Sequence, residues 1–165
     1  MLLTGAIGSG KTALGQDIGE VLSERGMAAA IVDLDWLGWV TVEPSGSTYY
    51  DLILANLKAI WPNLMAAGAR YYVLTRALTQ AEELARLRSV VPAELTVIRV
   101  TASPQTIERR LRARDTGAVL EEHLAESASM AAVVDRAAED SVVVSNDDRP
   151  IRGVSLEVLS LLGWL

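Results

Sequence analysis

The chain has 165 residues, of which 50% are apolar and 22% charged, and its net charge is −6. This length suffices for one domain with a buried core, and the acidic balance argues against general nucleic-acid binding, which needs a clustered basic surface. The lack of cysteine excludes disulfides, zinc–thiolate sites and thiol nucleophiles, and a single histidine excludes a histidine-rich metal site.

No segment has the pattern of a targeting or membrane-spanning sequence. The N-terminus lacks a basic segment followed by an apolar stretch and a small-residue cleavage site. Every long apolar run is interrupted by a charged residue, namely Asp33, Asp35, Arg70, Arg99 or Glu157. We therefore expect a cytoplasmic protein with no membrane and no nucleic-acid partner. Nothing in the sequence indicates an oligomeric state.

The first half of the chain alternates short apolar runs with longer helical patterns. Residues 1–4 are expected to form a strand, and residues 11–25 a helix that ends before a glycine. A second strand is expected at 28–34 and a second helix at 47–67. Pro62 should kink or restart that helix, because proline cannot donate a backbone hydrogen bond.

The second half continues the alternation. It predicts a strand at 71–74, a helix at 79–88 and a strand at 95–100. Ser103 should then cap a helix that begins at Pro104 and runs to Arg114. The remaining elements are expected to be a helix at 121–139, a strand at 142–145 and a closing helix at 151–162.

Continuous apolar strands that are each followed by a helix are typical of a parallel sheet covered on both faces. The fold class predicted for residues 1–165 is therefore α/β: a single domain with a three-layer, doubly wound, five-stranded parallel sheet. Ligands of such sheets bind at the carboxyl ends of the strands, so functional residues should follow strands.

The first strand is followed by a complete phosphate-binding loop. The segment Gly5-Ala6-Ile7-Gly8-Ser9-Gly10-Lys11-Thr12 matches G-x-x-x-x-G-K-[ST] at every fixed position, between a strand and a helix. The loop from Gly5 through Gly8, Ser9 and Gly10 should bring backbone N–H groups against phosphate oxygens. Lys11 should reach the β- and γ-phosphates, and the Thr12 hydroxyl should coordinate Mg²⁺. This predicts a P-loop NTPase fold. Gly15 and Gly19 should let the next helix approach the sheet closely.

Three further groups of polar or charged residues lie where a strand or a helix is expected to end. Asp33 and Asp35 lie at the carboxyl end of the second strand. Arg110 and Arg114 lie one helical turn apart, in a segment that holds five of the thirteen arginines. The fifth strand is followed by Asn146-Asp147-Asp148-Arg149-Pro150.

In these motifs the chain resembles the small P-loop kinases of the shikimate kinase, gluconate kinase and adenylylsulfate kinase group, related to the nucleoside monophosphate kinases. The resemblance implies ATP and Mg²⁺ as cofactors, with Asp33 supporting the metal and Asp35 contacting the acceptor hydroxyl and taking its proton. It implies that Arg110 stacks on adenine and that Arg114 contacts the phosphates and opens a short lid around residues 115–120. It also places adenine against the loop that contains Asn146, Arg149 and Pro150.

Other P-loop classes are disfavoured by what the chain lacks. A GTPase should carry N-K-x-D, which Asn146-Asp147 does not supply. A motor or transporter ATPase should end its third strand with acidic residues, whereas here the strand ends in Leu74-Thr75-Arg76. The expected function is therefore ATP-dependent transfer of the γ-phosphate to a hydroxyl of a small metabolite. The alternatives are a nucleoside monophosphate kinase and an ATP-binding regulatory module without transferase activity.

The acceptor segment favours an alcohol over a nucleoside monophosphate. Between Trp36 and Gly68 there is no arginine, and only Lys58 is positive, so an acceptor phosphate would find no arginine there. Arg76 is either a site for an acceptor anion or a surface residue. The aromatic residues of the segment either line a pocket or pack its helices, and packing is favoured: Trp36, Trp39, Tyr49, Tyr50 and Trp61. His123 is expected to be solvated.

Overall fold

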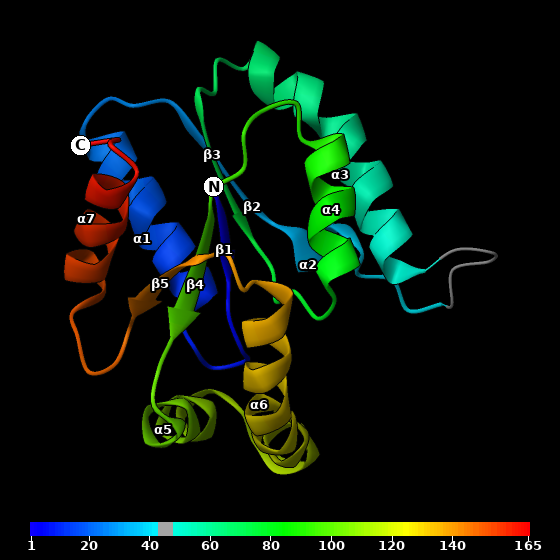
Figure 1. The fold of residues 1–165 in the computed structure, drawn as a ribbon, viewed down its shortest axis with the longest axis vertical. Helices are drawn as coiled ribbons and strands as arrows, with labels where there is room; N and C mark the ends of the chain where they lie inside the picture. Colours follow the sequence, from blue (N-terminus) through cyan, green and yellow to red (C-terminus); the bar gives the residue numbers. More distant parts are fainter. Residues whose placement is uncertain (43–47) are drawn as a thin grey trace.

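The computed structural model describes residues 1–42 and 48–165. Five parallel strands form one sheet in the order β2–β3–β1–β4–β5, with helices on both faces (Figure 1). The strands are β1 (Leu2–Thr4), β2 (Ala29–Asp33), β3 (Tyr71–Thr75), β4 (Val97–Thr101) and β5 (Val142–Ser145). The helices are α1 (Lys11–Glu24), α2 (Leu34–Leu37), α3 (Tyr49–Ala66), α4 (Ala81–Val90), α5 (Pro104–Arg114), α6 (Gly117–Ala137) and α7 (Ile151–Leu161). This arrangement confirms the predicted fold class.

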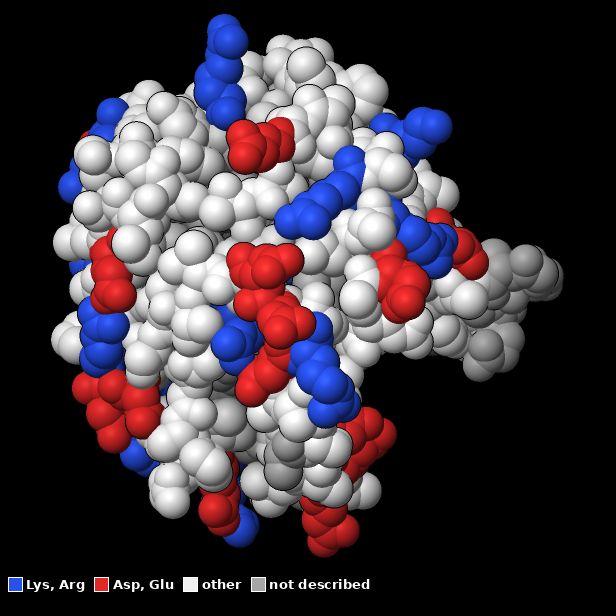
Figure 2. Space-filling model, in the orientation of Figure 1, with Lys and Arg blue, Asp and Glu red and all other residues white. Residues whose placement is uncertain are grey.

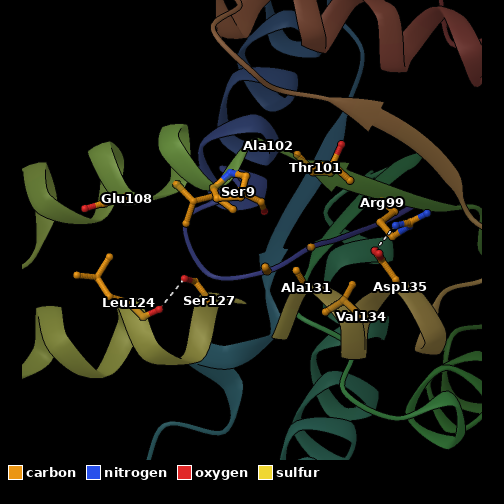
Figure 3. A pocket seen from close by; sticks show the side chains of 15 residues that line it. Ser9, Arg99, Thr101, Ala102, Glu108, Leu124, Ser127, Ala131, Val134 and Asp135 are labelled. Carbon is orange, nitrogen blue, oxygen red and sulfur yellow. Dashed lines mark hydrogen bonds and ion pairs between the residues drawn. The ribbon is translucent and has the colours of Figure 1, made fainter. Parts of the chain in front are cut away.

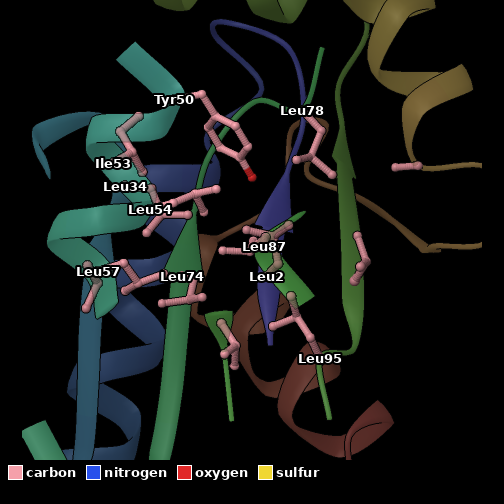
Figure 4. Packing of buried hydrophobic residues seen from close by; sticks show 14 of the residues in the cluster. Leu2, Leu34, Tyr50, Ile53, Leu54, Leu57, Leu74, Leu78, Leu87 and Leu95 are labelled. Atoms are coloured by element: carbon pink, nitrogen blue, oxygen red, sulfur yellow. The ribbon is translucent and has the colours of Figure 1, made fainter. Parts of the chain in front are cut away.

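Two hydrophobic cores lie on opposite faces of the sheet. Successive residues of a strand point to opposite faces, so Leu2 enters one core and Leu3 the other. The first core lies under α3 and α4 and contains Leu57 and Leu87 (Figure 4). The second lies under α1 and α7. The central strands are therefore buried on both faces, which explains their continuous apolar sequence.

Helix α1 lies unusually close to the sheet. A Cβ atom at Gly15 would meet the Thr75 side chain at 2.8 Å, and one at Gly19 would meet Ile31 at 2.7 Å. The structural role predicted for these two glycines is confirmed. The close approach brings the N-terminus of α1 to the carboxyl ends of β1 and β3.

Two details of the region after β2 differ from expectation. The strand ends at Asp33 because the Asp33 side chain accepts a hydrogen bond from Asp35 N and caps α2, a short helix that the sequence analysis missed. Helix α3 begins after Thr48, which forms a capping box with Asp51, and it runs through Pro62 without interruption. The expected restart at Pro62 is wrong, because the proline lies on the exposed side of the helix. The predicted start at Ser47 lies outside the described residues.

The connection between α5 and α6 is shorter than predicted. Helix α5 has the bounds expected from its Ser103 cap, but α6 begins at Gly117 rather than at residue 121. Of the segment 115–120, expected to be the lid, only Asp115 and Thr116 connect the two helices. Residues 118–120 are Ala-Val-Leu, which extend a helix readily, and this explains the earlier start.

Charges of both signs are interspersed on the face shown in Figure 2, where basic side chains alternate with acidic ones. Many of them are paired, as in the salt bridges of Arg152 with Asp17, Glu20 and Glu24. A surface of this kind provides no continuous basic stripe on this face. Within the described residues, no helix is both long enough and apolar enough to cross a membrane.

Candidate active site

The phosphate loop between β1 and α1 has the backbone geometry that its glycines predict. Gly8 and Gly10 have φ values of 81° and 93°, in the left-handed region that favours glycine. A Cβ at Gly10 would also approach Asn146 Nδ2 to 2.3 Å. Gly10 is the N-cap of α1, so the first N–H groups and the positive end of the helix dipole face the loop. The loop therefore forms an anion site.

Thr12 and Asp33 come together at the carboxyl end of β2. The Thr12 hydroxyl donates to Asp33 Oδ2 at 3.2 Å, and Asp33 Oδ1 accepts from Asp35 N at 3.1 Å. A hydroxyl beside a carboxylate fits Mg²⁺, which keeps several waters and binds proteins through one or two oxygen ligands in nucleotide sites. In the described part of the chain, no group of three or more carboxylate or histidine side chains could hold a metal ion.

Lys11 and Asp35 face each other across this site. Burial lowers the pKa of Lys11, while the charges of Asp35 and Asp33 act in the opposite direction. Desolvation also raises the pKa of Asp35, Asp33 adds to that rise, and Arg76 opposes it. A carboxylate with a raised pKa is a better proton acceptor than a fully solvated one. The phosphate and proton-transfer roles expected of Lys11 and Asp35 stay predictions.

Arg76 is not a plain surface arginine. Its side chain is 16% exposed and donates to Asp35 Oδ1 at 2.5 Å and to Glu83 Oε1 at 3.3 Å. The guanidinium carbon lies 4.9 Å from the centroid of the Tyr50 ring. The Arg76 guanidinium was one candidate site for an acceptor anion. In the structure it already contacts two carboxylates and an aromatic ring. Its position fixes one oxygen of Asp35, Oδ1.

Arg110 braces the phosphate loop in this structure. Its guanidinium donates to Ser9 O at 3.0 Å, to Gly8 O at 3.4 Å and to Asn146 O at 2.7 Å. Burial lowers the pKa of Arg110, with the nearby charge of Arg109 adding to the effect. Its hydrogen bonds to three carbonyl oxygens offset the cost of burying the charged guanidinium. The adenine contact expected of Arg110 stays a prediction.

Arg114 lies at the end of α5 and is paired with its neighbour. Its Nε and Nη2 atoms donate to the two Asp115 oxygens, each at 2.8 Å, and these bonds raise the pKa of Arg114. They also hold the pKa of Asp115 well below its usual range, helped by His123. His123 Nδ1 lies 2.8 Å from Asp115 Oδ2, so this half-buried residue is not the solvated histidine that we expected.

The loop after β5 is only partly at the site. Asn146 is 2% exposed and its Nδ2 donates to Ser9 O at 2.9 Å, so it supports the phosphate loop directly. Its backbone N–H donates to Thr101 O. Arg149 instead contacts Ser145 O and Glu157, away from the loop, and Pro150 is the N-cap of α7. The expected adenine contacts of these three residues stay predictions.

Most of the predicted residues line one cavity of about 810 Å³. Its walls combine the loop and α1, the end of β2 with α2, and the junction of α5 and α6, including Gly8, Gly10, Lys11, Thr12, Asp33, Asp35, Trp36, Trp39, Arg110, Arg114, Asp115 and His123. A volume of this size fits a small-molecule site. Three segments that are distant in the sequence thus meet where β2 and β1 end.

A second cavity of about 640 Å³ lies on the opposite side of the phosphate loop (Figure 3). Its lining is mainly apolar and includes Val134 and Ala131 of α6 and Ile107 of α5. An ion pair between Arg99 and Asp135 borders it. Ser9 of the phosphate loop, which is buried, also lines it.

The aromatic residues after β2 divide into two groups. Tyr50 and Trp61 are 6% and 5% exposed and belong to the core, as the packing interpretation expected. Trp36 and Trp39 are 67% and 68% exposed, so that interpretation is wrong for them. Trp36, which lies in α2, and Trp39, which follows the end of that helix, both line the cavity instead.

Three residues of the site were not predicted, namely Glu83, Asp115 and His123. Glu83 lies in the first turn of α4, where acidic residues commonly serve the helix itself, so its bond to Arg76 has no local sequence signal. Asp115 follows Arg114 directly, and that adjacency was a signal that could have found the pair.

Several solved structures that match this chain are small-molecule kinases. An unliganded sugar kinase from Janibacter sp. matches with a TM-score of 0.67 at 18% identity, covering 98% of this chain and 92% of its own. A gluconokinase from Sinorhizobium meliloti matches with a TM-score of 0.60 at 19% identity, covering 99% and 90%. The fold is that of the small P-loop kinases. An adenylylsulfate (APS) kinase from Mycobacterium tuberculosis, solved with AMPPNP and APS, gives 0.60 at 22%, covering 98% and 95%. No protein-family model and no curated protein matches the sequence.

Proposed function

We propose that this protein is an ATP-dependent phosphotransferase that moves the γ-phosphate of ATP to a hydroxyl of a small molecule. The observation that carries the proposal is the convergence of Lys11, the Thr12–Asp33 pair and Asp35 on one cavity. Phosphoryl transfer requires cations around the phosphate, a metal position and an acceptor held in line, with little covalent work by the protein.

Each residue has a distinct task. Backbone N–H groups of residues 8–12 bind the phosphates, and Lys11 neutralises charge on the β- and γ-oxygens. Thr12 and Asp33 would hold Mg²⁺, which would supply further charge neutralisation for the transferred phosphate. Arg114 exchanges Asp115 for the phosphates when the lid closes, and Arg110 and the loop at 146–150 contact the nucleotide.

The transfer step uses Asp35. The acceptor hydroxyl oxygen bonds to the γ-phosphorus while the bond from that phosphorus to the bridging oxygen breaks and ADP leaves. The hydroxyl proton passes to Asp35 Oδ2, because Arg76 occupies Oδ1. Asp35 is 53% exposed, so an acceptor can reach it from the cavity.

The test is phosphotransfer by the purified protein with ATP and Mg²⁺ across small alcohols and nucleoside monophosphates. We expect Lys11→Ala to reduce turnover by about 10²-fold or more, because one lost charge contact to a developing anion has that effect. ATP binding, measured by calorimetry, should also weaken. The matched control is Lys58→Ala, which removes the other lysine from the exposed side of α3 and should leave turnover unchanged.

Two outcomes would contradict the proposal. Nucleotide binding without turnover on any acceptor would favour a regulatory module. Fast turnover on a nucleoside monophosphate, undiminished in Asp35→Asn, would favour a nucleoside monophosphate kinase, because a phosphate acceptor does not need that base.

A further inference from the structure

Two tryptophans form an exposed stack at the edge of the candidate active site. The ring centroids of Trp36 and Trp39 lie 4.7 Å apart, with an interplanar angle of 19°. Their mutual stacking covers one face of each ring, yet both residues remain about two-thirds exposed. Large apolar residues exposed side by side, rimmed by polar groups, mark binding surfaces. Both line the same cavity as Lys11, and Trp36 directly follows Asp35.

Contacts with α3 hold the backbone segment that carries the two tryptophans. Asn56 Nδ2 donates to Leu37 O at 2.6 Å, at the end of α2. Gly38, between the two tryptophans, lies so close to α3 that a Cβ there would meet Ile53 at 2.6 Å. The backbone that carries the rings is therefore fixed, and a ligand that stacks on them need not order it.

The cations of the cavity already have partners or tasks. Arg76 is paired with Asp35 and Glu83, and Arg114 with Asp115. Arg110 donates to three carbonyl oxygens. Lys11 faces the phosphate loop, and among the described residues of the acceptor segment, 36–42 and 48–68, only Lys58 is positive and it does not line the cavity. An anionic group on the acceptor would meet Asp33 and Asp35 without a free cation.

We propose that the phosphate acceptor is an alcohol without an anionic group, carried on a ring whose flat face stacks on the Trp36–Trp39 pair while its hydroxyl reaches Asp35. This rests on the proposed function and names its substrate class. Indole rings stack on the flat faces of planar rings and attract cationic substituents. The class therefore comprises uncharged or amino-substituted sugars, nucleosides and aromatic alcohols, and excludes sugar acids and phosphates.

The test separates acceptor binding from transfer. Calorimetry in the presence of a non-hydrolysable ATP analogue and Mg²⁺ would compare uncharged sugars, nucleosides, aromatic alcohols and amino sugars with sugar acids and sugar phosphates. We expect saturable binding by a member of the first group. Trp36→Ala and Trp39→Ala should each weaken it about tenfold or more, as loss of a stacking side chain does, with binding of the ATP analogue unchanged. Met65→Ala, which truncates an apolar side chain on α3 that is 56% exposed, should have no effect.

The outcomes distinguish this inference from the proposed function. Stacking-dependent binding of a ring alcohol without phosphate transfer would retain the class of ligand and reject both its role as phosphate acceptor and the proposed function. Phosphate transfer that is fastest on a sugar acid and unaffected by Trp36→Ala would support the proposed function and reject the inferred acceptor class. The inference also fails if no uncharged or amino-substituted compound binds, or if the two variants instead dissociate a dimer in light scattering.

Discussion

Asp35 is the residue on which the chemistry depends, and its surroundings predict the pH dependence of the reaction. Only the deprotonated carboxylate accepts a proton, so kcat/KM should fall as the pH falls through the pKa of Asp35. Because desolvation raises that pKa above its ordinary value of 3.8, the acid limb should lie above pH 3.8. Asp35→Asn should lower kcat by about 10²- to 10⁴-fold, the usual contribution of a positioned base.

Arg76 provides the control for this assignment. Its charge lowers the pKa of Asp35, so Arg76→Gln should move the acid limb to higher pH. Glu83 keeps its bonds from Thr79 and from Gln80 N, and the fold around α4 should persist in this variant. An acid limb that does not move in Arg76→Gln would show that another group titrates.

At the scale of elements, the sequence predicted the position of an element correctly where a short local motif marks it. The phosphate loop lies between a strand and a helix, and Ser103-Pro104 fixes the start of α5, so both could be located without tertiary information. The end of β2 could not be located in this way. Asp33 ends the strand by capping α2, and a four-residue helix is too short to show an apolar period. The exposure of Trp36 and Trp39 followed from that missed helix.

The side-chain contacts of the site join residues that are even farther apart in the sequence. Arg76 and Asp35 are 41 residues apart, and Arg110 and the phosphate loop about a hundred. Such pairs have no spacing rule in the sequence, because the order of strands in the sheet brings them together. The sequence therefore proposed candidate residues for the site, whereas their pairing needed the structure.

The junction of α5 and α6 is the element that should respond to nucleotide. Arg114, Asp115 and His123 form a bonded group there, which Arg114 must leave to reach a phosphate. With a non-hydrolysable ATP analogue and Mg²⁺, amide exchange across residues 110–122 should slow by about tenfold, equivalent to about 1.4 kcal/mol of added opening free energy. Arg114→Ala should abolish this slowing, with residues 155–161 of α7 as the internal reference. An unchanged exchange pattern in the parent protein would argue against a closing lid.

At the scale of the whole molecule, nucleotide binding should stabilise the fold, because the site joins elements that are distant in the sequence. The phosphate loop, α2 and the α5–α6 junction all line the cavity, so a ligand that contacts them together binds the folded state only. At a nucleotide concentration of 100 times Kd, linkage adds about 2.7 kcal/mol to the free energy of unfolding.

That stabilisation gives a prediction that tests the metal assignment. For a chain of this length, 2.7 kcal/mol should raise Tm by about 5–11 °C in thermal unfolding with ATP and Mg²⁺. Omitting Mg²⁺ should reduce the rise in the parent protein, whereas in Asp33→Asn the rise should no longer depend on Mg²⁺. Asp135→Asn is the matched control, since Asp135 is an acidic residue on the border of the second cavity, on the other side of the phosphate loop. If the Asp33→Asn protein retains the full magnesium-dependent rise, Mg²⁺ is held by other groups, and the pairing of Thr12 with Asp33 has only a structural role.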